Sequence, residues 1–306
     1  MRLGSGSHSF EVEENWAKLP AGVTLGYTHG VVVDSKDRVY IHNQSKDSVI
    51  ALEKDGKFIS SWGPEFAPGA HGMYLSKEDG VEYLYLADPH RHIVVKTTMD
   101  GKVLYTLETP PLPNVYKTAD LYKPTDTAVA PNGDVYVCDG YGQSWIHVYD
   151  KKGTWIRSWG GAGSEPGKMK CPHGIWIDTR QSTPRVYVAD RGNNRIQIFS
   201  LVGEHLGFVT YDLRLPCCFY QYGSEQYIPD LHSRITILDE HDRLITHVGD
   251  VPGAYAKTGW PNVAKEELRP GMFSSPHACA VDSKGDLYVV EWIAVGRITK
   301  LKRVAQ

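Results

Sequence analysis

One short signature recurs six times along this chain of 306 residues, and it limits the possible folds more strongly than any other feature. Each copy has an alternating apolar run, a polar turn, a second alternating run and a third run. The copies begin near residues 29, 71, 125, 173, 217 and 277, at intervals of 42 to 60 residues. This period, with four strands per copy, is typical of a propeller blade. The sequence therefore predicts an all-β, six-bladed β-propeller, because a two-sheet sandwich does not explain six copies of one signature.

The two ends of the chain are expected to share the last blade. The sixth copy has only three runs, the last at 297–301, and the alternating run 9–13 precedes the first copy and can supply the missing outer strand. Such closure removes exposed strand edges. We expect one domain over residues 1–306, with an insertion at about 250–275 that contains short helix-like stretches such as 264–268.

Composition narrows the class of partner. The net charge is -3, so no basic field favours nucleic acid. The longest apolar runs are of strand length, and we expect no membrane association. Residues 1–8 lack the apolar segment of a secretion signal, and the five cysteines form no Cys-x-x-Cys pair. These features predict a cytoplasmic protein with reduced thiols that acts on a small molecule.

Three histidines open alternate copies: His71, His173 and His277. In a six-bladed ring, alternate positions lie about 120° apart and face one axis. Three imidazoles in that arrangement can bind one metal ion and leave a fourth position open. A neutral nitrogen set suits zinc or another divalent transition metal, whereas calcium takes oxygen ligands. Taken alone, each of these histidines could have a structural role, with its imidazole hydrogen-bonded to the backbone and no metal ion bound.

The turn after the second strand of each copy supplies a second set of candidates. Acidic residues recur there, so we expect most of them to hydrogen-bond their own turns. Two departures from the repeat indicate a site: Tyr141 as a general acid or base, and Arg191 as a cation for an anionic substrate group. Further candidates for substrate binding, or for support of the metal ligands, are His29, Asn43, Gln44, His232, Glu291 and Trp292.

The stretch from Val186 to Ile196 resembles an NHL repeat, a repeat that forms six-bladed propellers. Within that group, residues 23–302 look like peptidyl-α-hydroxyglycine α-amidating lyase. The resemblance implies a zinc ion bound by the three histidines that open alternate copies. It also implies a catalytic tyrosine in an Asp-Gly-Tyr motif, here Tyr141, and a substrate arginine after Val-Ala-Asp, here Arg191.

Three positions depart from the pattern of that family. The family has a substrate arginine in its first blade, where this chain has Asn43–Gln44. An aspartate that helps bind calcium follows the third histidine in the family and is Ala278 here, so we do not expect calcium. A disulfide cysteine follows the tyrosine in the family and is Gly142 here. We therefore expect this chain to share the family's metal site but not its substrate.

The sequence thus predicts a metal-dependent lyase or hydrolase, with a small hydroxylated or carbonyl substrate at the mouth of the propeller channel. Two alternatives stay open. One is a non-catalytic NHL propeller that serves as a protein- or ligand-binding platform, for which the insertion with Tyr255 and Trp260 offers a surface or a lid. The other is a sugar-lactone hydrolase-like propeller, which requires a carboxylate-rich calcium centre.

Overall fold

The computed structural model describes residues 2–304 and confirms an all-β, six-bladed propeller. Its strands form six sheets, of which five have four strands and one has five. The chain divides into two compact units. The central unit comprises residues 68–218, and the terminal unit comprises the two ends of the chain, up to residue 67 and from residue 219. Each unit contains three of the six sheets.

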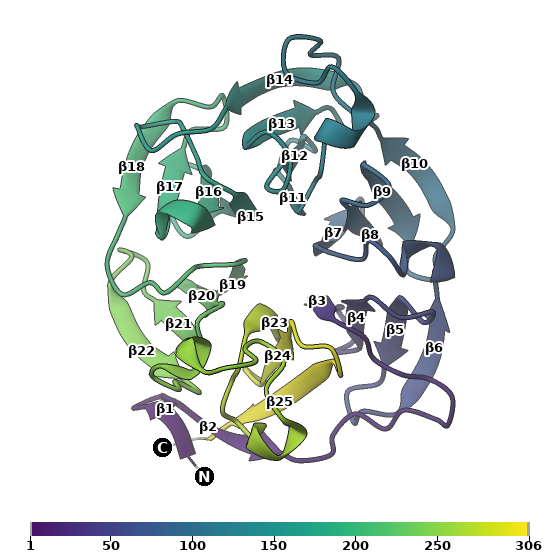
Figure 1. Ribbon diagram of the computed structural model, residues 1–306, viewed down its shortest axis with the longest axis vertical. Helices are drawn as coiled ribbons and strands as arrows, with labels where there is room; N and C mark the ends of the chain where they lie inside the picture. The colour runs from purple at the N-terminus through teal and green to yellow at the C-terminus, as the bar shows by residue number, and fades with distance from the viewer. Residues whose placement is uncertain (1, 305–306) are drawn as a thin grey trace. The chain divides into compact units, whose positions relative to one another are not determined.

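The three sheets of the central unit are antiparallel meanders, drawn from blue to green in Figure 1. The first contains β7 (Met73–Glu78), β8 (Val81–Asp88), β9 (Ile93–Thr98) and β10 (Val103–Leu107). The second contains β11 (Asp126–Val129), β12 (Val135–Cys138), β13 (Trp145–Tyr149) and β14 (Trp155–Gly160). The third contains β15 (Pro172–Asp178), β16 (Arg185–Asp190), β17 (Arg195–Phe199) and β18 (His205–Val209).

The terminal unit contains the other three sheets. One consists of β3 (Thr28–Val33), β4 (Val39–Asn43), β5 (Val49–Leu52) and β6 (Phe58–Trp62). Another consists of β19 (Tyr220–Tyr222), β20 (Glu225–Asp230), β21 (Arg234–Leu238) and β22 (Leu244–Val248). The five-stranded sheet combines β1 (Arg2–Ser5) and β2 (His8–Glu13) with β23 (Pro276–Val281), β24 (Leu287–Glu291) and β25 (Arg297–Arg303).

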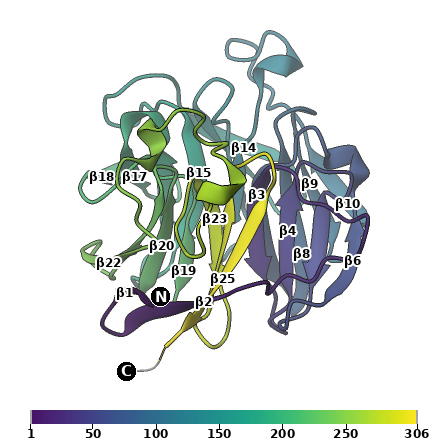
Figure 2. The same ribbon diagram turned by 60° about the horizontal axis from the view of Figure 1, so that its bottom comes forward.

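The predicted sharing of the last blade by both ends of the chain is confirmed. Strand β2 pairs antiparallel with β25, with Val12 opposite Leu301 (Figure 2). Strand β1 then pairs with β2 and adds a fifth strand to the sheet. Phe10 on β2 is fully buried in the core of this unit, so apolar packing as well as backbone hydrogen bonding holds the N-terminal strand in place.

Strand β12 shows why these short runs are apolar at every position. All four of its residues are buried. Tyr136 and Cys138 join a core cluster with residues of the β15–β18 sheet, such as Val188. Val135 and Val137 join another cluster with residues of the β7–β10 sheet. Successive strand residues point to opposite faces, and neighbouring blades cover both faces of β12. A run without polar alternation is the result.

The described residues form helices only as single 3₁₀ turns. These are η1 (Pro64–Phe66), η2 (Ala119–Leu121), η3 (Arg191–Asn193), η4 (Ala254–Ala256) and η5 (Lys265–Glu267). The last two lie in the predicted insertion at about 250–275. Within residues 2–304, no helix has the length and apolar character needed to cross a membrane.

Candidate metal centre and active site

In the central unit, His71 and His173 lie at local irregularities of their sheets. The pairing of β15 with β16 shifts register between Pro172 and Ile175, on either side of His173. His71 lies just before β7, and the amide of Gly72 leaves its own sheet to donate to Thr125 O, 3.0 Å away. Bulges of this kind re-aim a side chain and occur beside active sites. They turn both histidines out of regular strand pairing.

The glycine after each of these histidines permits a close approach to the next blade. A Cβ atom at Gly72 would lie 2.5 Å from Thr125 O. A Cβ atom at Gly174 would overlap the carbonyl oxygen of Cys217. The His-Gly pair in the sequence therefore has a structural cause, because the backbone after the histidine packs against the start of the following repeat.

Backbone carbonyls fix the tautomer of both imidazoles. His71 Nδ1 lies 2.6 Å from Thr125 O, and His173 Nδ1 lies 3.0 Å from Cys217 O. A carbonyl oxygen only accepts hydrogen bonds, so each Nδ1 carries the proton and each Nε2 carries the lone pair. Metal-binding histidines commonly donate their other ring N–H in this way. The two imidazoles, with ring centroids 4.9 Å apart, are thus in the form that binds a metal ion.

The hydroxyl of Tyr141 lies against both Nε2 atoms. It is 3.1 Å from His71 Nε2 and 3.0 Å from His173 Nε2. One hydroxyl proton can be donated to one of these nitrogens at a time, so the hydroxyl alone cannot satisfy both lone pairs. Burial of this end of the side chain raises the pKa of Tyr141 to about 12, although neighbouring Arg191 lowers it. Tyr141 therefore holds its proton at neutral pH.

Arg191 packs over the Tyr141 ring, with its guanidinium carbon 5.5 Å from the ring centroid. It donates to the Tyr141 hydroxyl at 3.4 Å, and to the sulfur atoms of Cys171 at 3.3 Å and Cys217 at 3.7 Å. Burial raises the pKa of the Cys171 thiol, while Arg191 lowers it. The central unit thus brings together two imidazoles, a phenol, a guanidinium and two thiols.

The turn that carries Tyr141 is organised around the buried carboxylate of Asp139. Its Oδ2 atom accepts from Tyr116 Oη at 2.6 Å and from Gln143 N at 2.6 Å, and its Oδ1 atom accepts from Lys123 N at 2.7 Å. Burial raises the pKa of Asp139 to about 6, and these hydrogen bonds oppose the rise. Asp139 therefore positions the turn and takes no direct part in the site.

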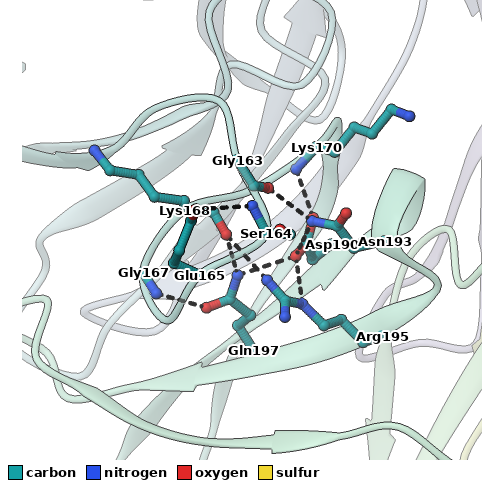
Figure 3. Close-up of polar contacts among 10 residues, drawn as sticks. All are labelled: Gly163, Ser164, Glu165, Gly167, Lys168, Lys170, Asp190, Asn193, Arg195 and Gln197. Atoms are coloured by element: carbon teal, nitrogen blue, oxygen red, sulfur yellow. Dashed lines mark hydrogen bonds and ion pairs between the residues drawn. The ribbon is translucent and has the colours of Figure 1, made fainter.

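The turn that carries Arg191 is organised around Asp190 (Figure 3). Its carboxylate accepts from Lys170 N at 2.7 Å and from Arg195 Nε at 2.7 Å. It also accepts from Asn193 Nδ2 and Gln197 Nε2, each at about 3 Å. The expectation that the repeated acidic residues hydrogen-bond their own turns agrees with both this turn and that of Asp139.

The terminal unit repeats part of this pattern with His29 and His277. Both lie at register shifts, one between Thr28 and Gly30 and the other between Pro276 and Ala278. His277 Nδ1 lies 2.7 Å from His29 O, so Nδ1 of His277 carries the proton and its Nε2 carries the lone pair. The two rings lie edge to face, with centroids 4.7 Å apart.

The predicted candidates Asn43 and Glu291 serve their own turns. Asn43 Oδ1 accepts from Gly26 N at 2.9 Å, and its Nδ2 donates to Asp47 O at 2.8 Å. The buried Glu291 carboxylate accepts from Ser274 N at 2.7 Å and pairs with Arg297. Gln44 donates its backbone amide to Tyr27 O at 2.9 Å. These contacts give each of the three polar residues a structural role in its own turn.

His232 and Trp292 belong to an aromatic cluster of the terminal unit. His232 stacks on Tyr255, with centroids 4.1 Å apart and rings 10° from parallel, and it meets Trp260 edge to face. Trp292 lies between Trp260 and Tyr27, with centroids 6.3 and 5.9 Å away. The insertion thus packs its aromatic residues on the turns after β20 and β24.

The sequence did not single out the two thiols on Arg191 as site residues. Cys217 had a signal, because it opens the fifth copy of the repeat at the position that His71 and His173 occupy in theirs. Cys171 had none, because it lies outside the repeated positions; its backbone is left-handed (φ 56°) two residues before His173. Within residues 2–304, which include all five cysteines, no disulfide is formed.

Comparisons with known proteins agree with this fold. A family model described as a 6-bladed beta-propeller matches residues 125–246. NHL repeat-containing protein 3 of Mus musculus is 29% identical over 65% of this chain, and its Homo sapiens counterpart is 28% identical over 92%. A probable peptidyl-alpha-hydroxyglycine alpha-amidating lyase of Caenorhabditis elegans is 30% identical over 54%. The matches span 59%, 81% and 46% of these proteins, respectively.

A solved structure supports the fold independently. A gluconolactonase from Xanthomonas campestris, XC5397, superimposes with a TM-score of 0.64 over 91% of this chain and 86% of its own, at 13% sequence identity. Similarity at that identity concerns the fold alone. The chain is thus a six-bladed β-propeller distantly related to NHL repeat-containing protein 3 and to peptidyl-α-hydroxyglycine amidating lyases.

Proposed function

We propose that the protein is a metal-dependent lyase or hydrolase for a small hydroxylated or carbonyl substrate. The observation that carries this proposal is the pair of imidazoles in the central unit. His71 and His173 both donate from Nδ1 to a carbonyl, and both direct Nε2 at the Tyr141 hydroxyl. A buried, neutral nitrogen donor set of this kind fits zinc or another divalent transition metal.

The proposal includes His277 as the third ligand. His277 opens its repeat as His71 and His173 do, and it donates from Nδ1 to a backbone carbonyl as they do. The distant relatives that are named amidating lyases support lyase activity. A lactonase-like propeller would instead need a calcium centre built from carboxylates. The carboxylates of Asp139 and Asp190, which a calcium centre would use, are engaged in their own turns.

The chemistry follows from the three kinds of side chain. A divalent ion, when bound, would stabilise negative charge that develops on a substrate oxygen. The Tyr141 hydroxyl carries a proton at neutral pH and can pass it to a leaving group. Arg191 offers donors in a fixed fork and can orient a substrate carboxylate or oxyanion beside Tyr141. Either elimination from a hydroxylated carbon or hydrolysis is compatible with these roles.

Metal content is the first test. Protein purified without a histidine tag is analysed for stoichiometric transition metal, alongside His173→Ala and the control His241→Ala, whose side chain is exposed. We expect one ion per chain in the unmodified protein and the control, and loss of the ion from His173→Ala. Protein that carries no transition metal and cannot be loaded with one would overturn the proposal.

The substrate class is tested separately. Metal-loaded protein is incubated with a peptidyl-α-hydroxyglycine, the substrate class in the lyase relatives' name, and in parallel with a sugar lactone. Release of a peptide amide identifies the lyase, and ring opening identifies the hydrolase. Turnover of neither compound by protein that holds its metal ion would favour the binding-platform alternative.

A further inference from the structure

We propose that Cys217 is a sulfur ligand of the metal ion at this site, next to His173. The inference rests on the proposed function, because it deepens the metal centre described there. It changes the expected donor set from nitrogen alone to nitrogen plus one thiolate. Zinc sites with mixed cysteine and histidine ligands are well known, so such a set suits the same ion.

The first support is position. Cys217 is fully buried, and its sulfur atom lies within 4.8 Å of a ring nitrogen of His173. The carbonyl of the same residue accepts from His173 Nδ1 at 3.0 Å, so Cys217 also sets the direction in which His173 presents Nε2. A buried residue that both orients one ligand and brings a sulfur atom beside it is well placed to be a ligand itself.

The second support is charge. Arg191 is always protonated and only donates, so the Cys217 sulfur is the acceptor in their 3.7 Å contact. Imidazole ligands are neutral, and they would leave the full charge of a divalent ion beside the guanidinium. A thiolate between the two cations offsets that repulsion. Thiolates are the metal-binding form of cysteine, and neighbouring arginine favours them.

Cys171 supplies a matched comparison. Its sulfur atom also accepts from Arg191, at 3.3 Å, and it too belongs to the central unit. Among the described residues, however, the groups spaced for a metal ion include Cys217 and omit Cys171. Both thiols contact the guanidinium, but of the two only Cys217 belongs to a group spaced for a metal ion, so they separate ligation from simple contact with Arg191.

The experiment uses the 306-residue chain loaded with Co²⁺ as a spectroscopic probe. A cobalt–thiolate bond gives a charge-transfer band in the near ultraviolet that nitrogen ligands do not give. We expect the band in the unmodified protein and in Cys171→Ser, and its loss in Cys217→Ser. A second measurement needs no variant: X-ray absorption of the zinc-loaded protein should show one sulfur at about 2.3 Å besides nitrogens at about 2.0 Å.

The outcomes separate this inference from the proposed function. Stoichiometric Co²⁺ without the band, or zinc with nitrogen and oxygen neighbours only, overturns the role of Cys217 and leaves the metal-dependent enzyme standing. A band that persists in Cys217→Ser and disappears in Cys171→Ser would show that Cys171 is the sulfur ligand, and it would overturn the role of Cys217. Absence of any bound metal ion overturns both proposals together. If Cys217→Ser fails to fold, X-ray absorption of the unmodified protein still decides.

Discussion

Two turns of the central unit occupy the same place in successive repeats, and each delivers one side chain to the candidate site. The turn after β12 starts at Asp139 and carries Tyr141, while β16 ends in Asp190 and is followed by Arg191. Both aspartates are buried and both accept several hydrogen bonds. They differ in their partners: the Asp139 carboxylate meets a phenol and backbone amides, whereas the Asp190 carboxylate meets the guanidinium of Arg195 (Figure 3).

The difference shows that one repeat position can be stabilised in two physical ways. Neutral donors leave the desolvation of Asp139 only partly offset, and burial raises its pKa to about 6. The largely buried guanidinium of Arg195 offsets the charge of Asp190 directly, so removal of either side chain leaves the other charge unpaired. Substitutions in the two turns should therefore change the free energy of unfolding by different amounts and with a different pH dependence.

The largest effect should come from the two delivered side chains themselves. Tyr141→Phe removes the hydroxyl between the two imidazoles and should lower kcat by about 10²–10⁴-fold, the usual loss for a general acid or base. Arg191→Lys keeps a charge but loses the fork, and it should lower kcat/KM by about 10²-fold. Steady-state kinetics check both variants. Metal content should stay at one ion per chain in Tyr141→Phe, and turnover equal to that of the unmodified protein would remove Tyr141 from the mechanism.

The next effect concerns stability, and it compares the two aspartates. Asp190→Ala leaves the largely buried Arg195 guanidinium without its carboxylate and should lower the free energy of unfolding by about 3–5 kcal/mol. Asp139→Ala leaves only neutral donors, at a cost of about 1–3 kcal/mol. Urea denaturation of both variants measures the difference. Equal losses would mean that the charge of the partner does not matter in these turns.

The third effect is a pH dependence of stability that originates in the Asp139 turn. The folded pKa of Asp139, about 6, lies above the ordinary value of 3.8, so the folded state binds this proton more tightly. Its stabilising contribution is complete below about pH 4 and is lost as the pH rises through 6. The free energy of unfolding of the unmodified protein, relative to Asp139→Asn, should therefore fall between pH 4 and 7. A constant difference across that range would contradict the prediction.

The sequence could predict the features that repeat and the features that break the repeat. Six copies of the signature predicted six blades. His71, His173 and Tyr141 were recognised as candidates because a regular strand or turn does not need a histidine or tyrosine at these positions. The spacing placed the N-terminal run in the last blade, which β2 confirms. The start of β7 at Met73, two residues after His71, could not be read, because Gly72 pairs with a carbonyl of the next blade.

The residues that could not be predicted owe their roles to contacts between segments that are distant in the sequence. Tyr116, which donates to Asp139, comes from a loop before β11 that has no counterpart in the repeat pattern. Cys171, whose thiol accepts from Arg191, has a left-handed backbone conformation. Neither residue stands at a repeated position of the sequence. The pattern of apolar residues predicts strands, and it does not predict the path of the loops that bring these side chains to their partners.

The last comparison tests the glycine in each turn. A methyl group at Gly142 would lie 1.9 Å from Oδ1 of the Asp139 carboxylate, which the turn holds by hydrogen bonds, and 2.4 Å from the backbone carbonyl oxygen of Leu121. A methyl group at Gly192 would lie 2.6 Å from the backbone carbonyl oxygen of Lys170 and 2.6 Å from Cγ of the same residue, so its contacts are less close than those at Gly142. Gly142→Ala should thus cost about 3 kcal/mol of unfolding free energy, and Gly192→Ala about 1–2 kcal/mol. Thermal denaturation gives the order of the two midpoints. If Gly192→Ala is the more damaging change, the Asp190 turn is the more rigid of the two, and its charged contacts rather than close packing determine how precisely Arg191 is placed.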